Sequence, residues 1–313
     1  MLRTDQTKES TMKYDPIIVV EVGPRDGLQY ESVFFPTERK IELIDRLSKT
    51  GLTRIEVTSF VHPKVIPHLR DAVEVIGGIT KAEEVTYSAL VPNLKGCQRA
   101  LETQIDELAL FVSASEAHNQ KNVGMSIDDS LRGFSEIVRL AHAAGKTVRG
   151  YVVTAFGCPY EGAIPLERVR NIIRAYAGMG VREISLGDTT GMANPRQIEE
   201  TFGALISENR EVPLAAHFHN SRGLGLANAM AAYHAGCRVF DSSVGGLGGC
   251  PTAVGAMGNI PTEDLVNMME EAGVKTGVDF GKLVFAADLI KEVLSVELAS
   301  FTYKQGRPKW VSQ

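Results

Sequence analysis

The feature that most constrains this chain is a regular alternation of short β-rich runs with longer amphipathic segments. Eight runs rich in β-branched residues predict strands, at residues 17–22, 54–58, 85–91, 107–112, 147–153, 183–187, 214–219 and 239–244. Eight segments with apolar residues at helical spacing predict helices, at 37–50, 69–77, 94–103, 130–144, 166–179, 195–208, 223–235 and 262–271. No composition break interrupts the series, so we expect one domain in which a helix follows every strand.

Residue types at the ends of the predicted helices support their boundaries. Asn194 directly precedes Pro195, which is typical of an N-cap followed by a first helical turn. Glycines are expected to end helices at their C-terminal sides, at Gly51, Gly145, Gly180, Gly236 and Gly273.

Strand followed by helix, eight times over, predicts a (β/α)8 TIM barrel. A doubly wound open sheet is the alternative, but it usually has a glycine-rich phosphate loop after its first strand, where this chain has residues 23–27, Gly-Pro-Arg-Asp-Gly. We expect the barrel over 16–277, after a frayed N-terminal tail over 1–15. Residues 278–313 are expected to form an extension that packs on the barrel or on a second subunit. It would comprise a helix over 279–296 and a polar tail from 301 anchored by Trp310.

Charge and cysteine usage narrow the class of partner. The net charge of the 313 residues is -5 and no lysine or arginine cluster is present, which argues against nucleic acid and anionic membranes. Four scattered cysteines without a C-x-x-C motif indicate a reducing compartment. The first 15 residues resemble no secretory signal, and no apolar run reaches membrane-spanning length. We therefore expect a cytoplasmic protein that acts on a small molecule.

Polar residues follow several predicted strands, at the edge where a barrel of this type carries its active site. Arg25 and Asp26 follow the first strand, and His217 and His219 end the seventh. Residues two apart in a strand point to the same side, so both imidazoles can share one ion with Asp26 and a further oxygen ligand. Such a set suits Mg²⁺, Mn²⁺, Co²⁺ or Zn²⁺. The alternatives are hydrogen-bonded core histidines and a simple Arg25–Asp26 salt bridge.

A glycine-rich run over residues 245–251 places the thiol of Cys250 after four glycines in five residues. Glycine makes ordering this backbone in a helix or strand costly, so we expect a mobile loop that can close. A tuned thiol there can supply or remove a proton, and Arg25 can stabilise an enolate or carboxylate oxygen. The pattern indicates carbon–carbon bond cleavage or formation through an enolate. The alternative is an ordinary turn in which Cys250 packs as a small hydrophobe.

Five segments together resemble the 3-hydroxy-3-methylglutaryl-CoA (HMG-CoA) lyase family: residues 20–29, 55–60, 157–162, 186–189 and 245–251. The similarity runs from about residue 17 to 285. The wider family of barrel metallolyases, which includes isopropylmalate and homocitrate synthases, shares the Arg-Asp motif, whereas the cysteine loop is more specific. The resemblance therefore implies cleavage of HMG-CoA to acetyl-CoA and acetoacetate, as in leucine catabolism, by a cytoplasmic homodimer or higher homo-oligomer.

Carried over residue by residue, the resemblance implies a divalent cation, Mg²⁺ or Mn²⁺, bound by Asp26, His217, His219 and Asn259. It implies that Arg25 stabilises the thioester enolate, that Cys250 protonates it, and that His217 also helps to move the hydroxyl proton. Further positions match the family's substrate pocket, namely Gln29, Glu56, Ser59, Tyr151 and Asp188. The pair Cys158-Pro159 is interpreted as shaping a loop.

One segment departs from the family pattern. Asn220-Ser221-Arg222 follows the second histidine where the characterised lyases have Asp-Thr-Tyr, which shifts the local charge by about two units. We expect Arg222 at the pocket rim, in contact with substrate. The departure leaves a citramalyl-CoA or a longer 3-methylglutaryl homologue open as the substrate. A condensing enzyme like 2-isopropylmalate synthase and a catalytically silent barrel that binds acyl-CoA or metal are the competing hypotheses for the activity.

Overall fold

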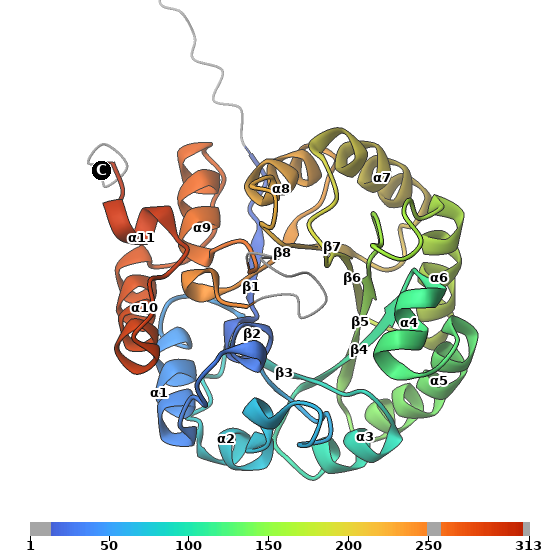
Figure 1. The fold of residues 1–313 in the computed structure, drawn as a ribbon, viewed down its shortest axis with the longest axis horizontal. Helices are drawn as coiled ribbons and strands as arrows, with labels where there is room; N and C mark the ends of the chain where they lie inside the picture. The colour runs from blue at the N-terminus through green and yellow to red at the C-terminus, as the bar shows by residue number, and fades with distance from the viewer. Residues whose placement is uncertain (1–13, 249–257, 309–313) are drawn as a thin grey trace, which may run out of the picture.

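A computed structural model describes residues 14–248 and 258–308, and within them the strands form one closed parallel barrel (Figure 1). Each strand pairs with the next along the chain, and the last pairs with the first. The predicted (β/α)8 barrel is confirmed. The strands are β1 (Ile18–Glu21), β2 (Arg54–Ser59), β3 (Thr86–Leu90), β4 (Glu107–Ser113), β5 (Thr147–Val153), β6 (Glu183–Asp188), β7 (Leu214–Phe218) and β8 (Val239–Ser242).

Helices surround the barrel and follow the predicted order. They are α1 (Thr37–Leu47), α2 (Ala72–Gly78), α3 (Leu94–Leu101), α5 (Ile127–Ala143), α6 (Leu166–Met179), α7 (Pro195–Glu208), α8 (Gly225–His234) and α9 (Thr262–Glu271). Asn194 caps α7 by accepting from Gln197 N at 3.1 Å, as predicted. The five glycines predicted to end helices all have positive φ, between 70° and 103°.

Several helical segments differ from the prediction, among them α5, which begins at Ile127 instead of residue 130. The connection after β4 contains α4 (Glu116–Val123), which the sequence pattern did not indicate. Ser115 caps it and Gly124 ends it at φ 73°, so local capping rather than an apolar stripe defines this helix. The second predicted helix begins at Ala72 instead of residue 69, because Pro67–Leu69 forms a separate 3-10 turn.

The C-terminal segment lies outside the ring of helices beside α1 and α9 (Figure 1). It contains α10 (Phe280–Leu294), near the predicted bounds, and a short α11 (Phe301–Gln305). The first residues of the expected polar tail thus form a short helix. Asp264 on α9 accepts from Ser300 Oγ and from the backbone N–H of the next two residues, which fixes this helix. Trp310 lies outside the described residues.

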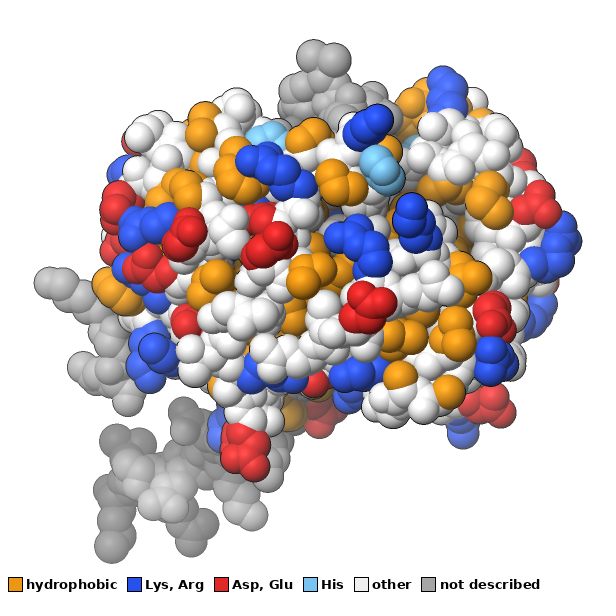
Figure 2. Space-filling view, turned by 90° about the horizontal axis from the view of Figure 1, so that it is seen from below, with side chains coloured by type: hydrophobic (Ala, Val, Ile, Leu, Met, Phe, Trp, Pro, Cys, Tyr) orange, Lys and Arg blue, Asp and Glu red, His pale blue; other side chains and the backbone are white. Residues whose placement is uncertain are grey.

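The outer surface seen from below Figure 1 mixes charges of both signs with scattered apolar side chains (Figure 2). None of the helices in the described ranges is long and apolar enough to cross a membrane. The barrel interior, by contrast, holds a buried ionic network. Its members are Arg54, Glu107, Arg149, Glu183 and Asp241.

Candidate metal centre and active site

A tight turn places Arg25 and Asp26 at the mouth of the barrel. Residues Gly23–Gly27 form one π-helical turn directly after β1, in which Val22 O accepts from the N–H groups of Arg25, Asp26 and Gly27. A β-carbon at Gly23 would lie 2.6 Å from Glu21 Oε1, so a larger residue at the start of this turn would displace the buried Glu21 side chain. The turn directs both charged side chains inward, where they are buried.

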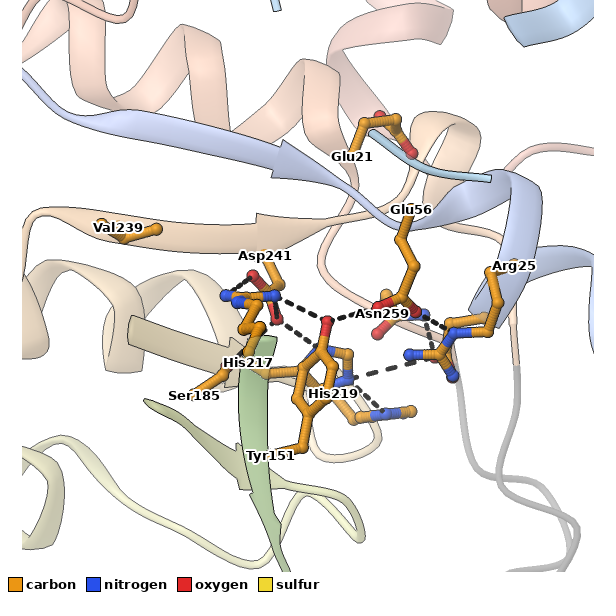
Figure 3. A network of polar contacts seen from close by, with 12 residues as sticks. Glu21, Arg25, Glu56, Tyr151, Ser185, His217, His219, Val239, Asp241 and Asn259 are labelled. Carbon is orange, nitrogen blue, oxygen red and sulfur yellow. Dashed lines mark hydrogen bonds and ion pairs between the residues drawn. The ribbon is translucent and has the colours of Figure 1, made fainter. Parts of the chain in front are cut away.

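Three potential ligands, Asp26, His217 and His219, come together at this mouth, and Figure 3 shows the two histidines beside Asn259 and Arg25. His217 and His219 project from the same face at the end of β7, as predicted, and their Nε2 atoms lie 3.3 Å apart. His217 Nε2 is 3.9 Å from Asp26 Oδ2. One ligand atom from each residue lies within 4.8 Å of the others, so the predicted trio forms one cluster.

The protonation states of this cluster suit a divalent cation. Burial lowers the pKa of His219 to about 4, and His217 and Arg25 add to that effect against the opposing Asp26 charge. Burial alone would raise the pKa of Asp26, but Arg25 and the two histidines outweigh it and lower the pKa to about 2. A neutral imidazole and a carboxylate are thus available at neutral pH. Nitrogen and oxygen donors of this kind fit Mg²⁺, Mn²⁺ or Zn²⁺.

Asn259 lies beside the cluster. Its Nδ2 donates to Asp26 Oδ2 at 2.8 Å and to Leu247 O at 3.2 Å, and its backbone forms an antiparallel bridge with His219. A ligand role requires Oδ1 to face the cation, which a half-turn of the amide would achieve. Its role as fourth ligand stays a prediction.

Arg25 is held by carboxylates on both sides. It pairs with Asp26 and with Glu56 on β2, and its guanidinium carbon lies 5.8 Å from the centre of the Tyr151 ring. Burial disfavours the charged guanidinium, but Glu56 and Asp26 raise the pKa of Arg25 above its ordinary value. Gln29 Nε2 donates to Asp26 Oδ1 at 2.8 Å. The predicted pocket positions Gln29, Glu56 and Tyr151 therefore lie around the Arg25–Asp26 pair.

Three other predicted pocket residues form hydrogen bonds with backbone groups of the loops that follow β2 and β6. Ser59 Oγ accepts from Val61 N at the end of β2. Asp188 accepts from two N–H groups after β6, and burial raises its pKa to about 6 against those hydrogen bonds. Exposed Arg222 donates from Nη1 to Thr190 O and Gly191 O at 2.8 and 2.9 Å. Arg222 thus joins the loop after β7 to the loop after β6.

The described part of the glycine-rich run begins with a compact turn, and the expected mobility of the run stays a prediction. Val244–Gly246 form a buried 3-10 turn, and Gly245 N donates to both carboxylate oxygens of Glu263 at 2.9 and 3.0 Å. Positive φ at Gly245, Gly246 and Gly248 lets the backbone make this compact stem. Cys250 lies outside the described residues, so its catalytic role stays a prediction.

Two residues of the site were missed by sequence reasoning. Asp241 on β8 accepts from His217 Nδ1 at 3.1 Å and from Ser185 Oγ at 3.1 Å. Arg149 on β5 donates to Asp241 at 2.7 Å. Each is a charged residue in a strand with mainly apolar neighbours, and that contrast was the available signal.

The fold and the site together define a class: a (β/α)8 barrel enzyme with a candidate divalent-cation site at the carboxyl ends of its strands. The family model described as HMGL-like matches residues 16–290. Hydroxymethylglutaryl-CoA lyase YngG of Bacillus subtilis is 49% identical over 284 residues, 91% of this chain and 95% of that protein. The human mitochondrial hydroxymethylglutaryl-CoA lyase is 45% identical, over 90% of this chain and 87% of its own.

Solved structures of HMG-CoA lyases have the same fold. The HMG-CoA lyase of Bacillus subtilis superposes with a TM-score of 0.91 at 48% identity, covering 94% of this chain and 99% of that one. An HMG-CoA lyase of Acinetobacter baumannii in complex with coenzyme A and 3-methylmalate gives 0.90 at 46% identity, over 94% of this chain and 96% of that chain. The chain belongs to the HMG-CoA lyase family, which confirms the resemblance drawn from its motifs.

Proposed function

We propose that this protein cleaves HMG-CoA to acetyl-CoA and acetoacetate. The observation that carries the proposal is the Asp26–His217–His219 cluster beside a carboxylate-held Arg25 in a chain of this family. Relatives 45 to 49% identical over most of the chain are HMG-CoA lyases. The enzyme class is therefore a carbon–carbon lyase.

The reaction moves one proton off the substrate and one back. The tertiary hydroxyl at C3 loses its proton, the C2–C3 bond breaks, and its electron pair forms the enolate of the acetyl thioester. Arg25, whose guanidinium stays charged, stabilises the developing oxyanion. Cys250 returns a proton to C2. Asp26, His217, His219 and Asn259 would hold the cation, which as a Lewis acid favours loss of the hydroxyl proton.

The proposed proton transfer by His217 is constrained by its contacts. Nδ1 is engaged by Asp241, and Nε2 faces His219 and Asp26. Ligation and proton transfer therefore require the same nitrogen. Asp188, whose pKa burial raises to about 6, is the last residue of β6, at the same end of the barrel. These contacts support the ligand role of His217, and its role in moving the hydroxyl proton stays a prediction.

The substrate panel is the decisive experiment. Purified protein with Mg²⁺ or Mn²⁺ is incubated with HMG-CoA, citramalyl-CoA and a longer homologue, and products are identified by mass. We expect acetoacetate and acetyl-CoA from HMG-CoA at the highest kcat/KM. Preference for citramalyl-CoA would contradict the proposed substrate, and CoA release from acetyl-CoA plus a 2-oxo acid would support condensation instead.

Further parts of the proposal concern the setting of the enzyme. We propose Mg²⁺ or Mn²⁺ as the native cation, a cytoplasmic location, a place in leucine catabolism and a homo-oligomeric state. The extension over residues 278–313 exposes Phe285 and Phe301, at 56% and 68%, which supports a subunit contact there. Light scattering of the purified protein tests the oligomer, since a monomeric mass would contradict it.

A further inference from the structure

A fully buried arginine, Arg149 on β5, touches both sides of the candidate site. Its guanidinium donates to Asp241 Oδ1 at 2.7 Å and Oδ2 at 3.2 Å, and from Nη1 to Tyr151 Oη at 2.6 Å. Its Nε donates to Glu183 Oε1 at 2.8 Å. Only 1% of the residue is exposed. A buried guanidinium is tolerated only when its hydrogen-bonding groups are satisfied, so these partners fix its position.

The first arm of this network leads to the candidate cation site (Figure 3). Arg149 holds the Asp241 carboxylate, which lies 3.1 Å from His217 Nδ1. A carboxylate can only accept, so Nδ1 carries the hydrogen and Nε2 presents its lone pair. That lone pair faces His219 and Asp26, where a cation would be bound.

The second arm leads to Arg25. Tyr151 Oη accepts from Arg149, so its single hydroxyl hydrogen is free to point elsewhere, and Glu56 Oε2 lies 2.9 Å away. Glu56 in turn pairs with Arg25 through its other oxygen. The Arg149 guanidinium thus sets the orientation of the Tyr151 hydroxyl. This hydroxyl in turn holds Glu56, the carboxylate that pairs with Arg25.

We propose that Arg149 is a positioning residue for the lyase reaction, fixing the tautomer of His217 through Asp241 and the orientation of Arg25 through Tyr151 and Glu56. Its side-chain hydrogen bonds go to Asp241, Tyr151 and Glu183, so it acts on the ligands and on Arg25 through these partners. The effect on kcat rests on the proposed function, whereas the effects on the His217 tautomer and on cation affinity do not.

Two variants interrupt the two arms of the network separately. Asp241→Asn removes the carboxylate that selects the tautomer, and Tyr151→Phe removes the hydroxyl that leads to Glu56. Mn²⁺ affinity is measured by electron paramagnetic resonance of free Mn²⁺ without substrate, and kcat and KM are measured for HMG-CoA. Loss of a carboxylate behind a ligating histidine typically weakens metal binding 10- to 100-fold. We expect at least tenfold weaker Mn²⁺ binding in Asp241→Asn, and binding within twofold of wild type but at least tenfold lower kcat in Tyr151→Phe.

Arg149→Met should lower both Mn²⁺ affinity and kcat. Arg149→Lys keeps the charge without the planar guanidinium, so it should restore neither Mn²⁺ affinity nor kcat to the wild-type value. Arg54→Met is the matched control, because Arg54 is a buried member of the same ionic network but pairs with Glu183 and Glu107 instead of either arm. It should lower stability while leaving Mn²⁺ affinity unchanged. Circular dichroism confirms that each variant is folded.

A second readout needs neither metal nor substrate. Long-range ¹⁵N–¹H correlation spectra of histidine-labelled protein report which ring nitrogen is protonated. We expect the Nδ1–H tautomer for His217 in the wild type and its loss in Asp241→Asn. Wild-type His217 in the Nε2–H form, or equal Mn²⁺ affinity in wild type and folded Asp241→Asn, would overturn the inference. Failure of the wild type to cleave HMG-CoA would contradict the proposed function while leaving the tautomer result intact.

Discussion

Gly258 packs against the backbone of the glycine-rich stem at Gly246 and Gly248, which is possible because Gly258 has no side chain. A β-carbon there would lie 2.3 Å from Gly248 O and 2.4 Å from Gly246 O, both backbone atoms of the run that leads to Cys250. Backbone atoms cannot rotate away as a flexible side chain can, so Gly258→Ala must displace the stem. We expect a loss of about 1–3 kcal/mol in the free energy of unfolding, measured in urea, and at least a tenfold fall in kcat.

A glycine in open space provides the control for that variant. Gly203 lies on α7, and a β-carbon there would have no atom within 4 Å. Alanine also favours a helix more than glycine does, so Gly203→Ala should stabilise the protein by about 0.5–1 kcal/mol with unchanged turnover. Wild-type activity in Gly258→Ala would show that the stem does not depend on this contact.

Glu263 makes stability depend on pH. Burial raises the pKa of Glu263 to about 8, and the nearby Glu21 and Asp264 add to the increase against the Gly245 N–H. In the unfolded chain the pKa is near 4.5, so between these values the native state holds a proton that the unfolded state has lost. The stabilisation is complete below pH 4.5 and disappears as the pH rises through 8.

Glu263→Gln should therefore flatten the pH profile, because glutamine resembles the protonated carboxyl. We expect the Tm of the variant to fall less than that of wild type between pH 5 and 8, measured by circular dichroism. Glu199→Gln, at an exposed position on α7, should keep the wild-type slope. Parallel profiles for wild type and Glu263→Gln would contradict the assignment.

At the scale of elements, the sequence predicts the strands and helices that carry a repeated apolar pattern. It misses the short helices that depend on individual hydrogen bonds. The strands and the main helices follow from apolar periodicity and from caps such as Asn194. By contrast, α4 and α11 lack a repeated apolar stripe and form because Ser115 and Asp264 satisfy their first turns.

The same distinction holds for the candidate site. His217 and His219 could be paired from their spacing alone, because strand geometry places both on one face. Asp241 on β8 faces His217 through the register of the neighbouring strand pair, whereas Arg149 on β5 reaches Asp241 from a strand that is not adjacent to β8. Their placement depends on register across the barrel, which a single sequence does not specify.

The attachment of α11 should depend on one carboxylate. Asp264 accepts from Ser300 Oγ and from Phe301 N and Thr302 N, at 2.7 to 3.0 Å. Asp264→Ala removes the acceptor of all three hydrogen bonds, so we expect a loss of about 1–2 kcal/mol in the free energy of unfolding. We also expect faster proteolysis near residue 300, followed by mass spectrometry. The matched variant Asp279→Ala removes the cap of α10 and should leave cleavage near residue 300 unchanged.

At the scale of the whole molecule, the candidate cation site joins distant parts of the chain. Asp26 follows β1 and the two histidines end β7, so the cluster exists only when the barrel is closed. A cation that binds only the folded state stabilises it by about 2.7 kcal/mol at a concentration 100 times its Kd. Stability should therefore report cation binding without any assay of turnover.

We expect the Tm to rise by several degrees as Mn²⁺ is added to chelator-treated protein, and to fall again with excess EDTA. The physical reason is linkage: each tenfold increase in Mn²⁺ above Kd adds about 1.4 kcal/mol to the folded state. Asp26→Asn should abolish the increase, because it removes the charged ligand of the cluster. Asp128→Asn, at an exposed position on α5, should retain it. An equal Mn²⁺-dependent increase in Asp26→Asn and wild type would place the stabilising cation elsewhere and exclude this cluster as its site.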